Sequence, residues 1–240
     1  MSLKRHIPNA ITSLNLLCGV IGIIVAMEDS VETAFLLMLA AVLFDFLDGL
    51  SARLLNAYTP SGKELDSLAD VVSFGVLPAI MMVKSYDSPA GFWSILAFLP
   101  LLIAVFSALR LARFNVDERQ HESFIGLPTP SCALVCGSLA CLLTDGKCLL
   151  NSCIWFIPAV SAVLCFLLVC DLPMFSFKFG KETNTDVVTK MKRIAIVSIS
   201  AIIVVLVIAF KLPWPAIVLG IILAYILENA LFWLLGPSRK

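Results

Sequence analysis

Four aspartates are the residues of this chain best suited to chemistry. Asp45 and Asp48 lie in one apolar segment, and Asp66 and Asp70 lie in the next, within a sequence that is 60% hydrophobic. An ionised carboxylate deep in a bilayer costs roughly 2.5–3.5 kcal/mol, so four of them require a compensating charge. Clustered carboxylates suit a hard divalent cation, and Mg²⁺ is commonly held by carboxylates together with a substrate phosphate. The aspartates therefore indicate metal-assisted phosphate chemistry at a membrane.

The spacing of the aspartates predicts that they converge. On a helix, Asp66 and Asp70 stand one turn apart on one face. The two acids of the preceding segment share an arc of roughly 140° with a glycine, an alanine and an arginine. The five residues of this arc are Asp45, Asp48, Gly49, Ala52 and Arg53. The glycine and the alanine leave a strip without bulky side chains, where a ligand can approach the backbone.

Two nearby bases offer the acids an alternative partner. Arg53 carries a fork of N–H donors that suits phosphate, and Lys63 follows in the polar region between the two segments. The alternative to a metal is a pair of interfacial salt bridges between these bases and the carboxylates. Two bases cannot neutralise four acids at that depth, so we favour a metal centre.

The motif formed by these residues resembles a family signature. From Asp45 to Asp70 the sequence reads D-x2-D-G-x2-A-R-x8-G-x3-D-x3-D, which matches every fixed position of the signature of the CDP-alcohol phosphotransferases. The resemblance implies that Asp45, Asp48, Asp66 and Asp70 hold one or two Mg²⁺ or Mn²⁺ ions on the diphosphate of a CDP-linked lipid. It also implies that Asp70 is the general base that accepts the proton of the acceptor hydroxyl.

Six residues are expected to contact CDP-diacylglycerol: Gly49, Ala52, Arg53, Thr59, Asn9 and Thr12. The resemblance implies this contact for Gly49, Arg53 and Thr59, and Ala52 belongs to the strip of small side chains beside the acids. Thr59 matches a family position that touches the nucleotide. Asn9 and Thr12, together with Asn15, are polar residues of the first apolar segment and are expected to face the nucleotide. The alternative for these three is hydrogen bonding between helices inside the bundle.

The remaining sequence predicts an all-α integral membrane protein. The mean hydropathy is +0.99, charged residues make up 14%, and apolar stretches of about twenty residues recur. We expect six helices in a phosphotransferase core at 1–180, and a cytoplasmic linker with a C-terminal helical pair at 181–240. The eight expected spans are 7–27, 32–55, 64–84, 91–114, 129–145, 153–171, 192–211 and 214–236.

The distribution of basic residues predicts the orientation. If the N-terminus lies inside, only Lys84, Lys147 and Lys211 of the 17 lysines and arginines fall in outer segments. Cytoplasmic segments carry an excess of such residues. We therefore expect a multi-pass protein of the plasma (inner) membrane with both termini and the aspartates on the cytoplasmic side. No nucleic-acid partner is expected, and the family resemblance implies a homodimer through membrane helices.

The acceptor is expected to bind at the end of the fourth span. Arg110 and Arg113 share a helix face, either to hold an anionic ligand or to anchor the helix at lipid phosphate. The segments 110–115 and 124–130, and the first span, resemble those of bacterial and archaeal membrane-bound phosphatidylserine synthases. This resemblance implies transfer of the phosphatidyl group from CDP-diacylglycerol to the L-serine hydroxyl, giving phosphatidylserine and CMP. Arg110, Arg113 and Asn115 would then bind serine.

Two other functions are weighed against this one. A sibling transferase would use glycerol 3-phosphate or inositol phosphate, which need more cationic contacts than serine. An ion channel or transporter could also line its path with acids, but the spacing of Gly49 and Arg53 has no role in conduction.

The cysteines are expected to be mainly structural. Most of the eight lie in apolar segments without C-x2-C pairs, so they are interpreted as small hydrophobic residues. Cys148 and Cys153 flank an expected outer loop and could pair if that face is oxidising.

Overall fold

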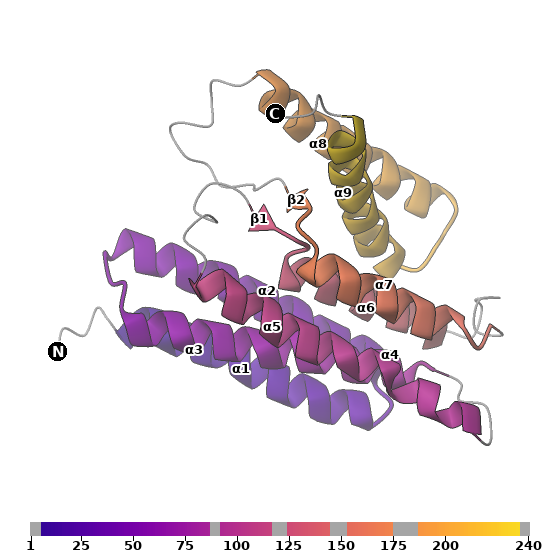
Figure 1. Ribbon diagram of the computed structural model, residues 1–240, viewed down its shortest axis with the longest axis horizontal. Helices are drawn as coiled ribbons and strands as arrows, with labels where there is room; N and C mark the ends of the chain where they lie inside the picture. The colour runs from indigo at the N-terminus through magenta and orange to yellow at the C-terminus, as the bar shows by residue number, and fades with distance from the viewer. Residues whose placement is uncertain (1–5, 87–91, 117–123, 145–152, 175–186, 236–240) are drawn as a thin grey trace.

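The computed structural model describes residues 6–86, 92–116, 124–144, 153–174 and 187–235, and it is almost entirely helical (Figure 1). A helix lies at each of the eight expected positions, which confirms the all-α membrane fold. The elements are α1 (His6–Met27), α2 (Val31–Leu54), α3 (Pro60–Asp70), η2 (Val71–Val76), α4 (Leu77–Lys84), η3 (Phe92–Leu101), α5 (Leu102–Val116), β1 (Phe124–Ile125), α6 (Thr129–Thr144), α7 (Phe156–Val169), β2 (Pro173–Met174), α8 (Val187–Ala209) and α9 (Pro215–Leu235).

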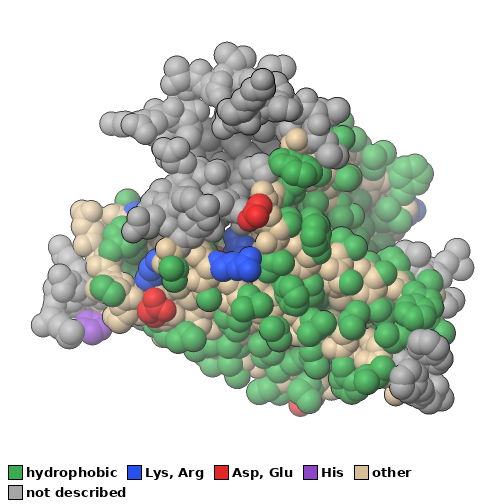
Figure 2. Space-filling view, in the orientation of Figure 1, with side chains coloured by type: hydrophobic (Ala, Val, Ile, Leu, Met, Phe, Trp, Pro, Cys, Tyr) green, Lys and Arg blue, Asp and Glu red, His purple; other side chains and the backbone are tan. Residues whose placement is uncertain are grey.

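The outer surface of the helices is apolar. Within the described ranges, four helical stretches are long and apolar enough to cross a membrane: His6–Met27, Val31–Leu54, Pro60–Lys84 and Ser94–Val116. The other apolar helices found there are shorter. Large side chains such as Phe46 and Phe98 are each 60% exposed, and hydrophobic side chains cover much of the face in Figure 2. Such a surface is unfavourable in water and suits lipid, as expected of a multi-pass membrane protein.

A tight turn joins the two helices that carry the aspartates. After α2, Asn56 adopts a left-handed backbone with φ of 49°, which asparagine tolerates better than most residues. The Thr59 hydroxyl then caps α3 by accepting a bond from the Gly62 N–H at 3.0 Å, and Pro60 occupies the first turn. This cap starts the helix at Pro60, earlier than the predicted 64. The turn brings the C-terminal half of α2 beside α3.

Two of the expected spans contain irregular helix. The third is interrupted by the π-helix η2, which begins directly after Asp70. The fourth begins as the 3₁₀-helix η3, which contains Pro100. Proline has no N–H to donate to the preceding turn, and it disfavours a regular α-helix there. Hydrophobic patterning locates a helix but does not specify its hydrogen-bond register, so regular helices were predicted in both places.

A short strand pair before α6 was not predicted. Within the described residues, Phe124 pairs with Met174 and Ile125 with Pro173 in an antiparallel ladder. Gly126 follows with φ of +78°, and a Cβ there would lie 2.8 Å from the Leu168 carbonyl oxygen, so the turn requires glycine. The turn fixes where α6 begins, at Thr129.

The C-terminal helices are attached to the core through α2 and α6. In Figure 1, α8 and α9 stand above the other helices and are inclined to them, and α9 packs on α6. The indole N–H of Trp214 donates to Glu32 at 2.7 Å, and its ring stacks on Phe35 with centroids 5.3 Å apart. Glu32 lies at the start of α2, at the opposite end from Asp48. The predicted boundary at 180/181 and Cys148 lie outside the described residues.

Candidate active site

Three of the four motif aspartates form one group. Asp45 and Asp48 come from α2 and Asp66 from α3, and one carboxylate oxygen of each lies within 4.8 Å of the other two. Asp45 lies nine residues before the end of α2 at Leu54, about 14 Å along the helix axis, so the group lies well inside the helical bundle. The group could therefore hold a metal ion between α2 and α3.

The carboxylates of this group have oxygen atoms available for a ligand. Asp48 Oδ2 and Asp66 Oδ1 are buried and have no hydrogen-bond partner in the described part of the chain. A buried carboxylate oxygen without a partner is costly, and a divalent cation would satisfy it. These residues therefore fit a divalent metal ion.

The neighbouring bases are engaged elsewhere. Arg53 Nε donates to the carbonyl oxygen of Gly49 at 3.0 Å, and Lys63 Nζ donates to that of Asn115 at 3.1 Å. Across the described ranges, the ion pair that the structure contains joins Lys84 to Asp29 rather than any motif aspartate. The described contacts thus do not contain the salt bridges considered as the alternative to a metal.

Asp70 lies beside the group of three but outside it. It is the last residue of α3 and is buried, with 8% of its surface exposed. Its Oδ1 accepts a hydrogen bond from Asn15 Nδ2 of α1 at 3.3 Å. Its carboxylate is near enough to interact electrostatically with Asp45 and Asp66. Asp70 therefore lies next to the group of three and is hydrogen-bonded to α1.

A cavity of about 710 Å³ opens beside Asp48 and Asp66. It lies between α1, α2, the turn into α3 and the end of α5. Most of the residues predicted to contact the CDP-linked lipid line it, namely Asn9, Thr12, Gly49, Ala52 and Thr59. Arg53 is exposed and is not among the lining residues. The cavity is large enough for a nucleotide.

Lys63 is a cavity residue that sequence reasoning did not assign to the substrate. It lines the same cavity, and its bond to the Asn115 carbonyl connects α3 to the end of α5. The Asn115 side chain in turn donates to Ser67 Oγ at 2.9 Å. The position of Lys63, directly after Gly62 of the motif, was the available signal. The contact of Lys63 with α5 is tertiary, so it cannot be predicted from the spacing of residues along the chain.

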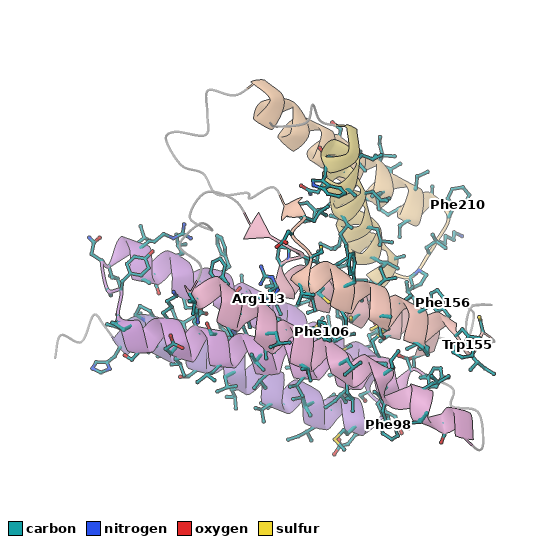
Figure 3. The ribbon with its side chains drawn as sticks, in the orientation of Figure 1. Phe98, Phe106, Arg113, Trp155, Phe156 and Phe210 are labelled. Carbon is teal, nitrogen blue, oxygen red and sulfur yellow. The ribbon has the colours of Figure 1, made fainter. Side chains whose placement is uncertain are left out.

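The structure separates the three residues predicted to bind serine. Arg110 is 7% exposed, and its Nη1 donates to Thr129 Oγ1 at 2.8 Å. Arg113 is exposed on α5 (Figure 3), and Asn115 lines the cavity. A helix turns by 100° per residue, so Arg113 points about 60° away from Arg110 and Asn115 further still. In this bundle that rotation is enough to take Arg113 to the surface.

Arg110 faces the same interior as Asp70. Its guanidinium interacts electrostatically with the Asp70 carboxylate, and its Nε has no hydrogen-bond partner within the described region. Thr129, which sequence reasoning did not identify, is fully buried and accepts a hydrogen bond from Nη1 of the guanidinium. A buried arginine with an unused donor beside a candidate base suits an anionic group of a small ligand.

Comparisons with known proteins identify the family of this chain. Residues 5–167 match the sequence model of the CDP-alcohol phosphatidyltransferase family. A CDP-diacylglycerol--serine O-phosphatidyltransferase of Mycobacterium tuberculosis (strain CDC 1551 / Oshkosh) is 38% identical over 176 residues, covering 70% of this chain and 60% of the relative. The enzyme of that name from Bacillus subtilis (strain 168) is 38% identical over 128 residues, covering 52% of this chain and 70% of the relative.

An archaeal relative extends the comparison. The archaetidylserine synthase of Methanothermobacter thermautotrophicus is 40% identical over 134 residues, covering 55% of this chain and 56% of the relative. The chain thus spans about 60% of the length of the mycobacterial relative. The family match covers more than half of the chain and includes the complete aspartate motif. This chain belongs to the CDP-alcohol phosphatidyltransferase family.

Proposed function

We propose that this chain transfers the phosphatidyl group of CDP-diacylglycerol to the hydroxyl of L-serine, giving phosphatidylserine and CMP. The observation that carries the proposal is the group of three carboxylates at the edge of a nucleotide-sized cavity, with the buried Arg110 close to Asp70. The serine acceptor is supported by relatives that are named for serine and are 38% identical.

The donor would bind on the cavity side. Asp45, Asp48 and Asp66, with Asp70 beside them, would hold one or two divalent ions, Mg²⁺ or Mn²⁺. Such ions, when bound, neutralise the diphosphate and the charge that develops on the leaving CMP. Gly49 lets the nucleotide lie against the backbone of α2, since nothing lies within 4 Å of the position of a Cβ there. Lys63 adds positive charge to the cavity wall.

The acceptor would bind on the buried side. Arg110 would pair with the serine carboxylate through its free Nε and an Nη, with Arg113 and Asn115 nearer the cytoplasmic entrance. The serine hydroxyl oxygen forms a bond to the phosphorus that carries diacylglycerol, and the bond from that phosphorus to the oxygen of CMP breaks. Asp70 accepts the hydroxyl proton. Holding both substrates in this arrangement would supply much of the rate enhancement, because the reaction becomes effectively unimolecular.

The membrane placement of the reaction is part of the proposal. Arg53, Lys63, Arg110 and Arg113 lie at the aspartate end of their helices, whereas Lys84 lies at the opposite end. This asymmetry supports an active site that faces the cytoplasm from the inner membrane, with both termini on that side. We further propose a homodimer through the apolar outer helices, and a division into a core at 1–180 and a C-terminal unit at 181–240.

An acceptor panel tests the proposal. The purified protein would be supplied with CDP-diacylglycerol in mixed micelles, Mn²⁺ or Mg²⁺, and either L-serine, glycerol 3-phosphate or inositol phosphate. CMP release with serine alone is the expected result. If a phosphorylated polyol released CMP and serine did not, the serine assignment would be wrong. Ion flux across liposomes without CMP release would instead support a channel or transporter.

A further inference from the structure

Asn15 contacts the candidate base directly. It is 0% exposed, and its side-chain amide donates to Asp70 Oδ1 at 3.3 Å. A carboxylate only accepts hydrogen bonds, so the amide nitrogen must be the atom that faces it. Asn15 Oδ1 has no hydrogen-bond partner among the described residues, and Asn15 does not line the nucleotide cavity. Among the described residues, the Asn15 side chain therefore makes one hydrogen bond, and its acceptor is Asp70.

The backbone around this contact is fixed by a close approach of two helices. Ser73 Oγ of the π-helix η2 donates to the Asn15 carbonyl oxygen at 3.0 Å. One turn further along α1, a Cβ on Gly19 would lie 2.9 Å from Ser73 Cα, so only glycine permits this packing. A π-helix shifts the register of a helix and is frequent at functional sites. Here the shift lies directly after Asp70, the residue that contacts Asn15 of α1.

We propose that Asn15 is a positioning residue that fixes the orientation of the Asp70 carboxylate. By holding Oδ1 against α1, Asn15 determines which oxygen of Asp70 faces the acceptor hydroxyl. This inference rests on the proposed function in one respect only, namely that Asp70 receives the proton of the acceptor. The contact itself, and its effect on the fold, can be tested without an acceptor.

A kinetic double-mutant cycle tests the positioning role. Asn15→Ala should lower kcat by about 10- to 100-fold, the range expected for a lost hydrogen bond to a charged group, with the KM values of serine and CDP-diacylglycerol changed by less than about threefold. In an Asp70→Asn background, the same substitution should change kcat by less than about twofold, because there is no carboxylate left to orient. An equal fall in both backgrounds would mean that Asn15 acts only on the fold.

A melting experiment tests the contact when no acceptor is assumed. At about pH 8 without divalent ions, Asn15→Asp removes the amide donor and places a second buried acid against Asp70, so it should lower Tm. Adding Asp70→Asn restores an amide–carboxylate pair and should recover at least half of the lost Tm. The control combines Asn15→Asp with Asp171→Asn, which removes an exposed carboxylate far along the chain and should recover nothing.

The two experiments separate the possible failures. If wild-type protein released no CMP with serine, the proposed acceptor would be wrong, and the melting data would still decide the contact. If the Asn15→Asp and Asp70→Asn double variant melted no higher than Asn15→Asp alone, the contact would be refuted. Ser161→Ala, which removes a buried hydroxyl bonded within α7, should leave kcat within about twofold and controls for loss of any buried hydrogen bond.

Discussion

The two sides of the aspartate centre differ in access to solvent. On the side proposed for the donor, a cavity of about 710 Å³ has the small residues Gly49 and Ala52 and the exposed Lys63 among those that line it. On the inner side, Arg110 is 7% exposed, while Asn15 and Thr129 are fully buried. An open cavity would accommodate the large, variable lipid donor that we propose. A buried polar site discriminates strongly, because a wrong ligand leaves buried groups without partners. Acceptor choice should therefore depend on the inner side.

The largest effects are expected where the two sides meet. Asp66→Asn or Asp45→Asn should lower turnover by more than about 100-fold, because even outer partners of a metal site cost 10- to 100-fold when removed. Each variant should also weaken CDP-diacylglycerol binding, since the diphosphate would bind through the ion. Turnover at saturating Mn²⁺ and donor binding by calorimetry would measure both. The matched control is Glu64→Gln, an exposed carboxylate on α3, the helix of Asp66. Full turnover in an aspartate variant would remove that residue from the site.

Asp70→Asn should separate chemistry from donor binding. Loss of a general base lowers kcat by about 10²- to 10⁴-fold. Donor affinity should change by less than about threefold, because Asp70 lies outside the group of three carboxylates. Single-turnover CMP release and equilibrium binding of CDP-diacylglycerol provide the two measurements. An equal loss of donor affinity would assign Asp70 to the metal site alone.

The two arginines of α5 should sharpen the contrast between buried and exposed positions. Arg110→Ala should raise the KM of serine by about 10- to 100-fold, as expected for a buried charge-assisted pair, and leave donor affinity nearly unchanged. Arg113→Ala should raise the KM of serine by only about two- to fivefold, because exposed ion pairs contribute little. Initial rates at varied serine and at varied donor give both constants. If Arg110→Ala reduced donor affinity instead, Arg110 would hold lipid phosphate.

The smallest effect is expected from Lys63 on the open side. Lys63→Ala should raise the KM of CDP-diacylglycerol by about two- to fivefold, since an exposed charge is screened by water and salt. The effect should shrink as NaCl is raised, and the KM of serine should remain unchanged. Kinetics at low and high salt would show this. A rise in the KM of serine larger than that of the donor would contradict the division into two sides.

The sequence predicted the parts of this site that depend on spacing within a helix. Asp45 and Asp48 lie one turn apart, and a short turn returns the chain to Asp66, so their convergence follows from helix geometry. The contact between Arg110 and Thr129 could not be predicted in this way, because it depends on the glycine turn at Gly126 that starts α6. It is a contact between two helices.

The register of the third span was also beyond sequence reasoning. Hydrophobic patterning predicted a continuous helix there, whereas the structure inserts η2 directly after Asp70. A π-helix changes which backbone groups pair without changing which residues are apolar, so the pattern contains no signal for it. The contact of Asn15 with Asp70 depends on this insertion and on the close approach at Gly19.

The most direct test of the central claim follows the hydroxyl oxygen of serine. Protein in micelles with CDP-diacylglycerol and Mn²⁺ would receive L-serine labelled with ¹⁸O in its hydroxyl, and both products would be analysed by mass spectrometry. Attack of that oxygen on the phosphorus that carries diacylglycerol predicts labelled phosphatidylserine and unlabelled CMP. Phosphatidylserine without the label, or CMP release with no incorporation of serine into lipid, would contradict the proposed transfer.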